Sequence, residues 1–214
     1  MPNRRLAALG LSVLLAGCAL GDRPKLESPG QAASTTVARG SPSGAPGADK
    51  ILAALEQSAD QSTFTAKYHL TRKLGDVERD AVVVHRPGAT AVTIGDWTFI
   101  RDGQDRTCQT STGKCVPGIL LQRVSDVINT DNFWASTAAI QIRLGLGQRS
   151  ADPTFSSEPV AGQNSDCVSI PLGGGVEKYC VGPTGIETLT NRNDLAVRLT
   201  ALSPTIDEKV FRRG

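Results

Sequence analysis

The fold is decided by the stretch from Cys167 to Cys180, which reads CVSIPLGGGVEKYC. Gly173 and Gly174 separate two alternating runs, and such dipeptides supply the positive φ angles of two-residue hairpin turns. A two-residue turn fixes the register, so Cys167 faces Cys180 at a non-hydrogen-bonded pair. Cα atoms at such a pair are about 4.5 Å apart, within the range that a disulfide closes. We therefore predict an antiparallel hairpin closed by a Cys167–Cys180 disulfide.

Three further turn dipeptides precede this hairpin, at Gly75-Asp76, Gly95-Asp96 and Asp102-Gly103. Each lies between runs of alternating apolar and polar residues, the pattern of a half-buried strand. A two-residue turn at the first dipeptide pairs Leu74 with Val77. The third dipeptide is expected to set Cys108 opposite Trp97. The chain thus predicts strands that follow one another in hairpins.

Helical periodicity appears in three places, at residues 49–59, 118–128 and 131–144. The predicted order is one helix, five or six strands, two short helices, and four or five strands. Strands in consecutive hairpins, with the helices kept apart from them, indicate an α+β domain with one antiparallel sheet.

Cys108 and Cys115 flank a loop that contains Thr112-Gly113, and we expect a second local disulfide between them. The alternative is a zinc site built from these two residues with Cys167 and Cys180. The pairs are separated by six and twelve residues, whereas zinc knuckles have two to four between their cysteines. Two disulfides, typical of an exported protein, are the favoured interpretation.

The N-terminus predicts export. Arg4 and Arg5 precede a short apolar run over residues 6–15, which is too short for a membrane span. Leu15-Ala16-Gly17 before Cys18 resembles the lipobox of bacterial lipoproteins. The resemblance implies that residues 1–17 are a signal peptide, that Cys18 carries a diacylglycerol, and that the protein is anchored in the cell membrane on its exported face. An ordinary secretory signal that ends near a cysteine is the alternative.

Residues 18–48 are expected to form the lipidated N-terminus and a flexible tether, and residues 49–214 the folded domain. The tether is rich in Pro, Gly, Ser and Ala, cannot bury a core, and would average about 30 Å end to end. Loss of residues 1–17 removes two of 23 basic residues and no acidic one, leaving 21 of each. A formal charge of zero argues against a nucleic-acid partner, and acyl chains suffice for membrane attachment.

Catalytic signatures are missing from the sequence, so we predict no enzyme, no cofactor and no metal. His69 and His85, the two histidines, fall on opposite faces of the first hairpin. No Gly-x-Ser-x-Gly nucleophile elbow occurs. The glycines at 173–175 lead into a strand rather than a helix, so a phosphate-binding loop is not indicated.

The order of elements resembles the LolA-like half-barrel, and within it the LppX/LprG-like lipoproteins of actinobacterial envelopes. The resemblance covers about residues 49–211 and rests on the lipobox and tether, the strand STFTAKYHL at 62–70, the turn at 94–97, the helix pair at 118–144, and Pro159 to Gly162 leading into 167–170. It implies a strongly curved sheet covered by a few helices, with a cavity for the acyl chains of a lipid or glycolipid.

One face of the predicted sheet and the helices facing it carry the apolar side chains that would line such a cavity. These candidates are Phe64, Tyr68, Val83, Val92, Ile94, Trp97, Phe99, Ile119, Val124, Phe133 and Trp134. Apolar surfaces facing each other either close into a core or leave a pocket. An open pocket predicts a lipid-binding or lipid-transport protein. The alternative is a filled half-barrel that serves as an envelope protein-interaction or stress-sensing module.

Overall fold

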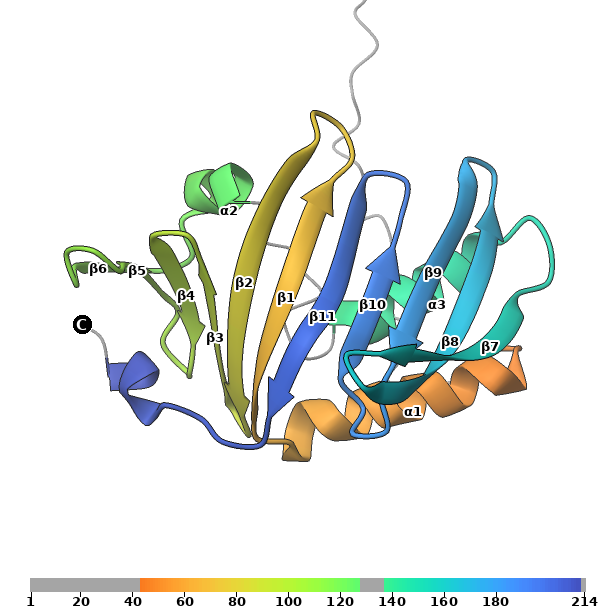
Figure 1. Cartoon of the computed structure of the whole chain (residues 1–214), viewed down its shortest axis with the longest axis horizontal. Helices are drawn as coiled ribbons and strands as arrows, with labels where there is room; N and C mark the ends of the chain where they lie inside the picture. Colours follow the sequence, from red (N-terminus) through yellow and green to blue (C-terminus); the bar gives the residue numbers. More distant parts are fainter. Residues whose placement is uncertain (1–42, 128–136, 213–214) are drawn as a thin grey trace, which may run out of the picture. The chain divides into compact units, whose positions relative to one another are not determined.

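The computed structural model describes residues 43–127 and 137–212. In this part, eleven strands form one antiparallel sheet in the order β6-β5-β4-β3-β2-β1-β11-β10-β9-β8-β7 (Figure 1). Neighbours in the sheet are also neighbours in sequence, except where β1 pairs with β11. The sheet therefore consists of two meanders, joined where the first strand pairs with the last. The predicted α+β class with a single antiparallel sheet is confirmed.

The elements follow the predicted order. Helix α1 (Pro46–Gln61) precedes the first meander, and helices α2 (Leu121–Val127) and α3 (Thr137–Gln148) separate it from the second. The 3-10 helix η2 (Glu208–Arg212) ends the described chain. The strands are β1 (Phe64–Arg72), β2 (Val77–Arg86), β3 (Ala89–Ile94), β4 (Trp97–Arg101), β5 (Arg106–Gln109), β6 (Cys115–Pro117), β7 (Thr154–Val160), β8 (Gln163–Leu172), β9 (Gly175–Val181), β10 (Glu187–Asn191) and β11 (Leu195–Ser203).

Both predicted disulfides are present. Cys167 lies directly opposite Cys180 in the β8–β9 ladder, and their sulfurs are bonded. Cys108 pairs with Cys115 across β5 and β6 in the same way. The first bridge is buried within the sheet, whereas Cys115 of the second is only half-buried. All four cysteines among the described residues therefore form disulfides, and the zinc alternative is wrong.

Two predicted registers are wrong. In the first hairpin Arg72 pairs with Val77, because residues 73–76 form a four-residue turn. This shift of two leaves every side chain on its predicted face, since faces alternate with period two. In the third hairpin Cys108 pairs with Thr98 rather than Trp97. The Asp102 carboxylate there accepts hydrogen bonds from the Gln104 amide and the Arg106 guanidinium. The connection is therefore longer than the two residues that Asp102-Gly103 predicts.

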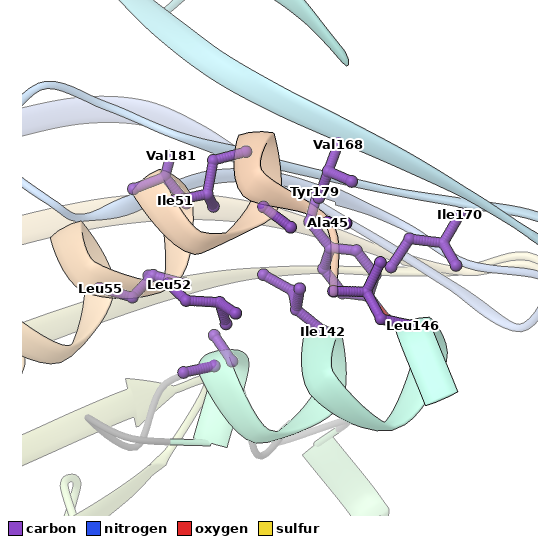
Figure 2. Close-up of a cluster of buried hydrophobic side chains, with 13 residues drawn as sticks. Ala45, Ile51, Leu52, Leu55, Ile142, Leu146, Val168, Ile170, Tyr179 and Val181 are labelled. Carbon is purple, nitrogen blue, oxygen red and sulfur yellow. The ribbon is translucent and has the colours of Figure 1, made fainter. Parts of the chain in front are cut away.

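Helices α1 and α3 pack together against β8 and β9 (Figure 2). The apolar residues of α1 recur on one side, and Ile51, Leu52 and Leu55 are all buried there. Ile142 and Leu146 of α3 meet them one turn apart. The strands contribute Val168, Ile170, Tyr179 and Val181. This cluster fixes both helices on one half of the sheet.

A separate cluster lies under η2, next to β3. Val210 and Phe211 of η2 are buried against side chains of β2 to β5, including Val84, Ala91 and Ile100. The Arg86 guanidinium lies 4.9 Å above the Phe211 ring. Val84 alternates with Val83, so this cluster and the predicted cavity residues occupy opposite faces of the sheet. Within the described residues, no helix is long and apolar enough to cross a bilayer.

Candidate binding surfaces

The predicted cavity residues gather on one face of the sheet. Tyr68, Val83, Val92, Ile94 and Phe99 belong to one buried cluster formed by β1 to β4 and β11, together with Val160 of β7. Four further candidates pack against its margin and stay partly exposed: Phe64, Trp97, Ile119 and Val124. The remaining two, Phe133 and Trp134, lie outside the described residues. The sequence thus grouped these side chains on the correct face.

Within this cluster the described side chains meet one another closely. The side chains of Val92, Ile94 and Phe99 have no exposed surface at all. At the margin the Arg123 guanidinium of α2 lies 4.6 Å above the Trp97 ring. A buried cluster with a half-exposed aromatic margin matches either a filled core or the floor of a lipid site.

Two tyrosine side chains of the sheet, Tyr68 and Tyr179, are buried and donate hydrogen bonds through their hydroxyls. The Tyr68 hydroxyl donates a hydrogen bond of 2.9 Å to the Glu187 carbonyl, and the Tyr179 hydroxyl donates one of 2.6 Å to the Glu177 carboxylate. Burial is the main cause that raises the pKa of both tyrosines far above the ordinary value. Both hydroxyls therefore stay protonated and act as structural donors.

The histidines do not form a catalytic pair. His85 is buried, its Nδ1 lies 2.7 Å from the Thr90 hydroxyl, and its ring packs at 5.1 Å from Phe64. His69 lies on the other face, exposed, with Nδ1 2.9 Å from Asp80. The two imidazoles therefore lie on opposite faces of the first hairpin, as the sequence predicts, and each has its own hydrogen-bond partner.

One group of potential metal ligands occurs among the described residues, formed by Glu158, Cys167 and Cys180. Both cysteines are held in the disulfide, so their sulfurs are not thiolates and cannot bind a metal in that form. The Glu158 carboxylate forms an ion pair with Lys178, and that hydrogen bond lowers its pKa. The group is structural.

Among the described residues, open hollows lie along α1. One of about 340 Å³ separates the start of α1 from β7 and β8 and is lined by Gly47, Ile51 and Phe155. A second of about 290 Å³ continues beside Ala54 to Pro183. Lys50 and Asp166 border both and form an ion pair of 2.8 Å. Hydrogen bonds, first from Lys50 and then from Ser157, lower the pKa of Asp166.

No pattern in the sequence predicts these hollows. They arise where α1 crosses strands of the second meander, which begin about a hundred residues later in the chain. Gly47 permits the close approach, because a Cβ there would lie 2.8 Å from the Phe155 ring.

A long, curved antiparallel sheet with helices packed along it defines a LolA-like fold, the class that the element order resembles. Solved structures of MucB have this fold. The first is 14% identical, with a TM-score of 0.51, and the match covers 80% of this chain and 63% of that one. A MucA/MucB complex from Pseudomonas aeruginosa gives 13% identity and a TM-score of 0.52, covering 78% and 60%.

At these identities the likeness concerns the fold alone. The chain spans about 60% of the length of the MucB structures that it matches. No protein-family profile matches the chain, and no curated protein does.

Proposed function

We propose that this chain is a membrane-tethered, non-enzymatic module that binds another protein at the exported face of the cell membrane. The observation that carries the proposal is the location of its open surfaces. Among the described residues, the side chains of the face that would hold a lipid are buried against one another, and hollows open along α1 and β7. Surface hollows beside a strand suit a protein ligand.

Two further facts support this proposal. Two disulfides favour an oxidising, extracytoplasmic compartment, in agreement with the signal peptide and the lipidation of Cys18 that the sequence predicts. MucB, which shares the fold, has been solved in complex with the periplasmic part of MucA. The MucB complex therefore provides one example of a domain with this fold that binds another protein.

In-cell crosslinking tests the proposal. The full chain would be expressed in its own host, crosslinked on intact cells and recovered for identification of attached proteins. We expect one envelope protein to be enriched over a control in which an unrelated lipoprotein carries the same tag. If no protein is enriched and lipid co-purifies instead, the second candidate function replaces this one.

The second candidate is an acyl-lipid carrier of the LppX/LprG-like kind. It is favoured by the partly buried side chains at the margin of this cluster, Phe64, Trp97 and Ile119, and by the exposed Leu120 and Leu121 that follow Ile119. Acyl chains would lie between the sheet and α2, with the headgroup outside. Native mass spectrometry of the purified chain tests it: bound lipid supports the carrier, and a lipid-free protein that takes up no fluorescent fatty acid excludes it.

A further inference from the structure

Strand β7 is one of the two edges of the sheet, since only β8 pairs with it. An edge strand presents backbone N–H and C=O groups that can pair with another extended chain. Which groups point outward follows from the turn. Ala161 and Gly162 both have positive φ, so Val160 and Gln163 flank a two-residue turn and form a hydrogen-bonded pair.

Hydrogen-bonded and non-hydrogen-bonded pairs alternate from that turn. Pro159, Ser157 and Phe155 occupy the non-hydrogen-bonded positions, so their backbone groups point away from β8. Pro159 has no N–H and therefore offers only its carbonyl. In the described part of the chain, the amides of Phe155 and Ser157 bond to no other backbone group. The open edge thus offers two donors and three acceptors.

The two halves of β7 differ. The C-terminal half carries Pro159 and Glu158, whose carboxylate forms an ion pair with Lys178. A proline and a charged side chain are two features that protect an edge strand from pairing with other chains. The N-terminal half, Thr154 to Ser157, is exposed and has neither feature. Phe155 leaves 46% of its surface exposed, and its ring borders the 340 Å³ hollow at the start of α1.

We infer that the N-terminal half of β7 binds an extended peptide segment of the partner protein, which adds a twelfth strand to the sheet. This inference rests on the proposed function and names where it acts. The peptide backbone would pair with Phe155 and Ser157, and an apolar side chain would enter the hollow against the Phe155 ring. The charged groups there, Lys50 and Asp166, neutralise each other, so the matching side chain is uncharged.

A second copy of the chain fits this edge less well. Antiparallel pairing of two β7 strands would join only Phe155 and Ser157 of each copy, through four backbone hydrogen bonds. The whole of β7, with seven residues, spans only about 24 Å. A contact along one such edge buries far less than the roughly 1,200 Å² that a stable dimer needs. A peptide, in contrast, follows the edge and fills the hollow.

Ser157→Pro gives a sharp test, because the substitution removes an outward N–H but no backbone hydrogen bond to β8. Natural Pro159 shows that the neighbouring outward position tolerates proline. Ser157→Ala is the matched control, since it loses the same hydroxyl bond to Asp166 but keeps the amide. Thermal unfolding of both variants checks that the fold is intact.

The probe is a fluorescein-labelled peptide selected on the full wild-type chain from a displayed library of random peptides. We expect selected peptides to alternate apolar and polar residues. Binding to Ser157→Pro should be at least about tenfold weaker, while Ser157→Ala stays within about threefold of wild type. Amide exchange at Phe155 and Ser157 should slow when the peptide is added.

Three outcomes overturn the inference: a library that enriches no peptide, equal binding to both variants, or a wild-type dimer that Ser157→Pro converts to monomer. The crosslinking experiment separates this failure from failure of the proposed function. If Ser157→Pro still captures the cellular partner, the edge is wrong and protein binding stands. If wild type captures none, protein binding itself fails.

Discussion

Gly185 sets how closely the connection between β9 and β10 approaches α1. Its φ is +71°, and a Cβ there would lie 2.1 Å from the Ala54 carbonyl oxygen. The left-handed conformation alone costs a non-glycine residue about 1–2 kcal/mol. Gly185→Ala adds a clash with helix backbone, so we expect it to lower the free energy of unfolding by more than about 3 kcal/mol.

Urea denaturation measures this loss, and Gly88→Ala is the control. Gly88 has a similar φ of +78° but no atom within 4 Å of the added Cβ. Its substitution should cost only the backbone strain. Equal losses for the two variants would mean that α1 does not pack against this turn.

His69 is the residue whose titration should be visible in solution. A hydrogen bond with Asp80 is the largest cause that raises its pKa above the usual 6.5, and Glu78 adds a smaller effect. A raised pKa stabilises the folded state fully below about 6.5, and this contribution disappears as pH rises through the folded-state pKa. We expect Asp80→Asn to lower the His69 pKa more than Glu78→Gln does.

An NMR titration of the imidazole protons checks the order of these effects. A His69 pKa at or below 6.5 in the wild-type protein would contradict it. Because the His69 side chain is 41% exposed, solvent screens the gain in stability, and we expect the pKa itself to be the clearer readout.

Among the elements, the two disulfide hairpins make unequal contributions to stability. The Cys167–Cys180 bridge is buried and joins residues that are 13 positions apart in the sequence. The Cys108–Cys115 bridge joins residues that are only 7 positions apart. Loop-closure entropy predicts losses of about 3 and about 2 kcal/mol when the bridges are removed. Cys167→Ala with Cys180→Ala should therefore lower the melting temperature more than Cys108→Ala with Cys115→Ala.

Differential scanning calorimetry of the two double variants measures both losses under the same conditions. The reverse order, with the β5–β6 pair more costly, would show that the β8–β9 hairpin holds its register without the bridge.

Hairpins were the elements best predicted from sequence. The Gly173-Gly174 turn gave the correct pairing of Cys167 with Cys180, because a two-residue connection leaves one register. The positive φ predicted for these two glycines was wrong, since it occurs at Gly175 instead. The pairing of Val92 with Phe99 was correct for the same reason. The errors at 73–76 and 102–105 arose where the turn was longer, and its length depends on side-chain hydrogen bonds such as those of Asp102.

Across the whole domain, the state of the inner cluster decides between the two candidate functions. If the face is filled, Phe99→Ala removes a fully buried ring and should cost about 3–5 kcal/mol. Val176→Ala, at a residue that is 56% exposed, should change stability by less than about 0.5 kcal/mol. A loss below about 1 kcal/mol for Phe99→Ala, in chemical denaturation, would indicate that the ring faces a hollow and would favour the lipid carrier.

The membrane anchor is tested on the complete chain. Cys18 lies outside the described residues, and its lipidation is proposed from the lipobox alone. Cys18→Ser removes the thiol that would carry the diacylglycerol, so the protein should move from the membrane fraction to the soluble fraction and lose labelling by a radioactive fatty acid. Cys18→Ser protein that stays in the membrane fraction would contradict the anchor.

The local order of the chain fixed the meanders, both disulfides and the apolar face, because turn chemistry and the alternation of side chains act between near neighbours. The pairing of β1 with β11 and the packing of α1 on β8 and β9 join residues more than a hundred positions apart. No local pattern specifies such contacts. The hollow beside Phe155 and the open edge of β7 exist only because those distant contacts form, so the candidate binding surface became visible in the folded molecule.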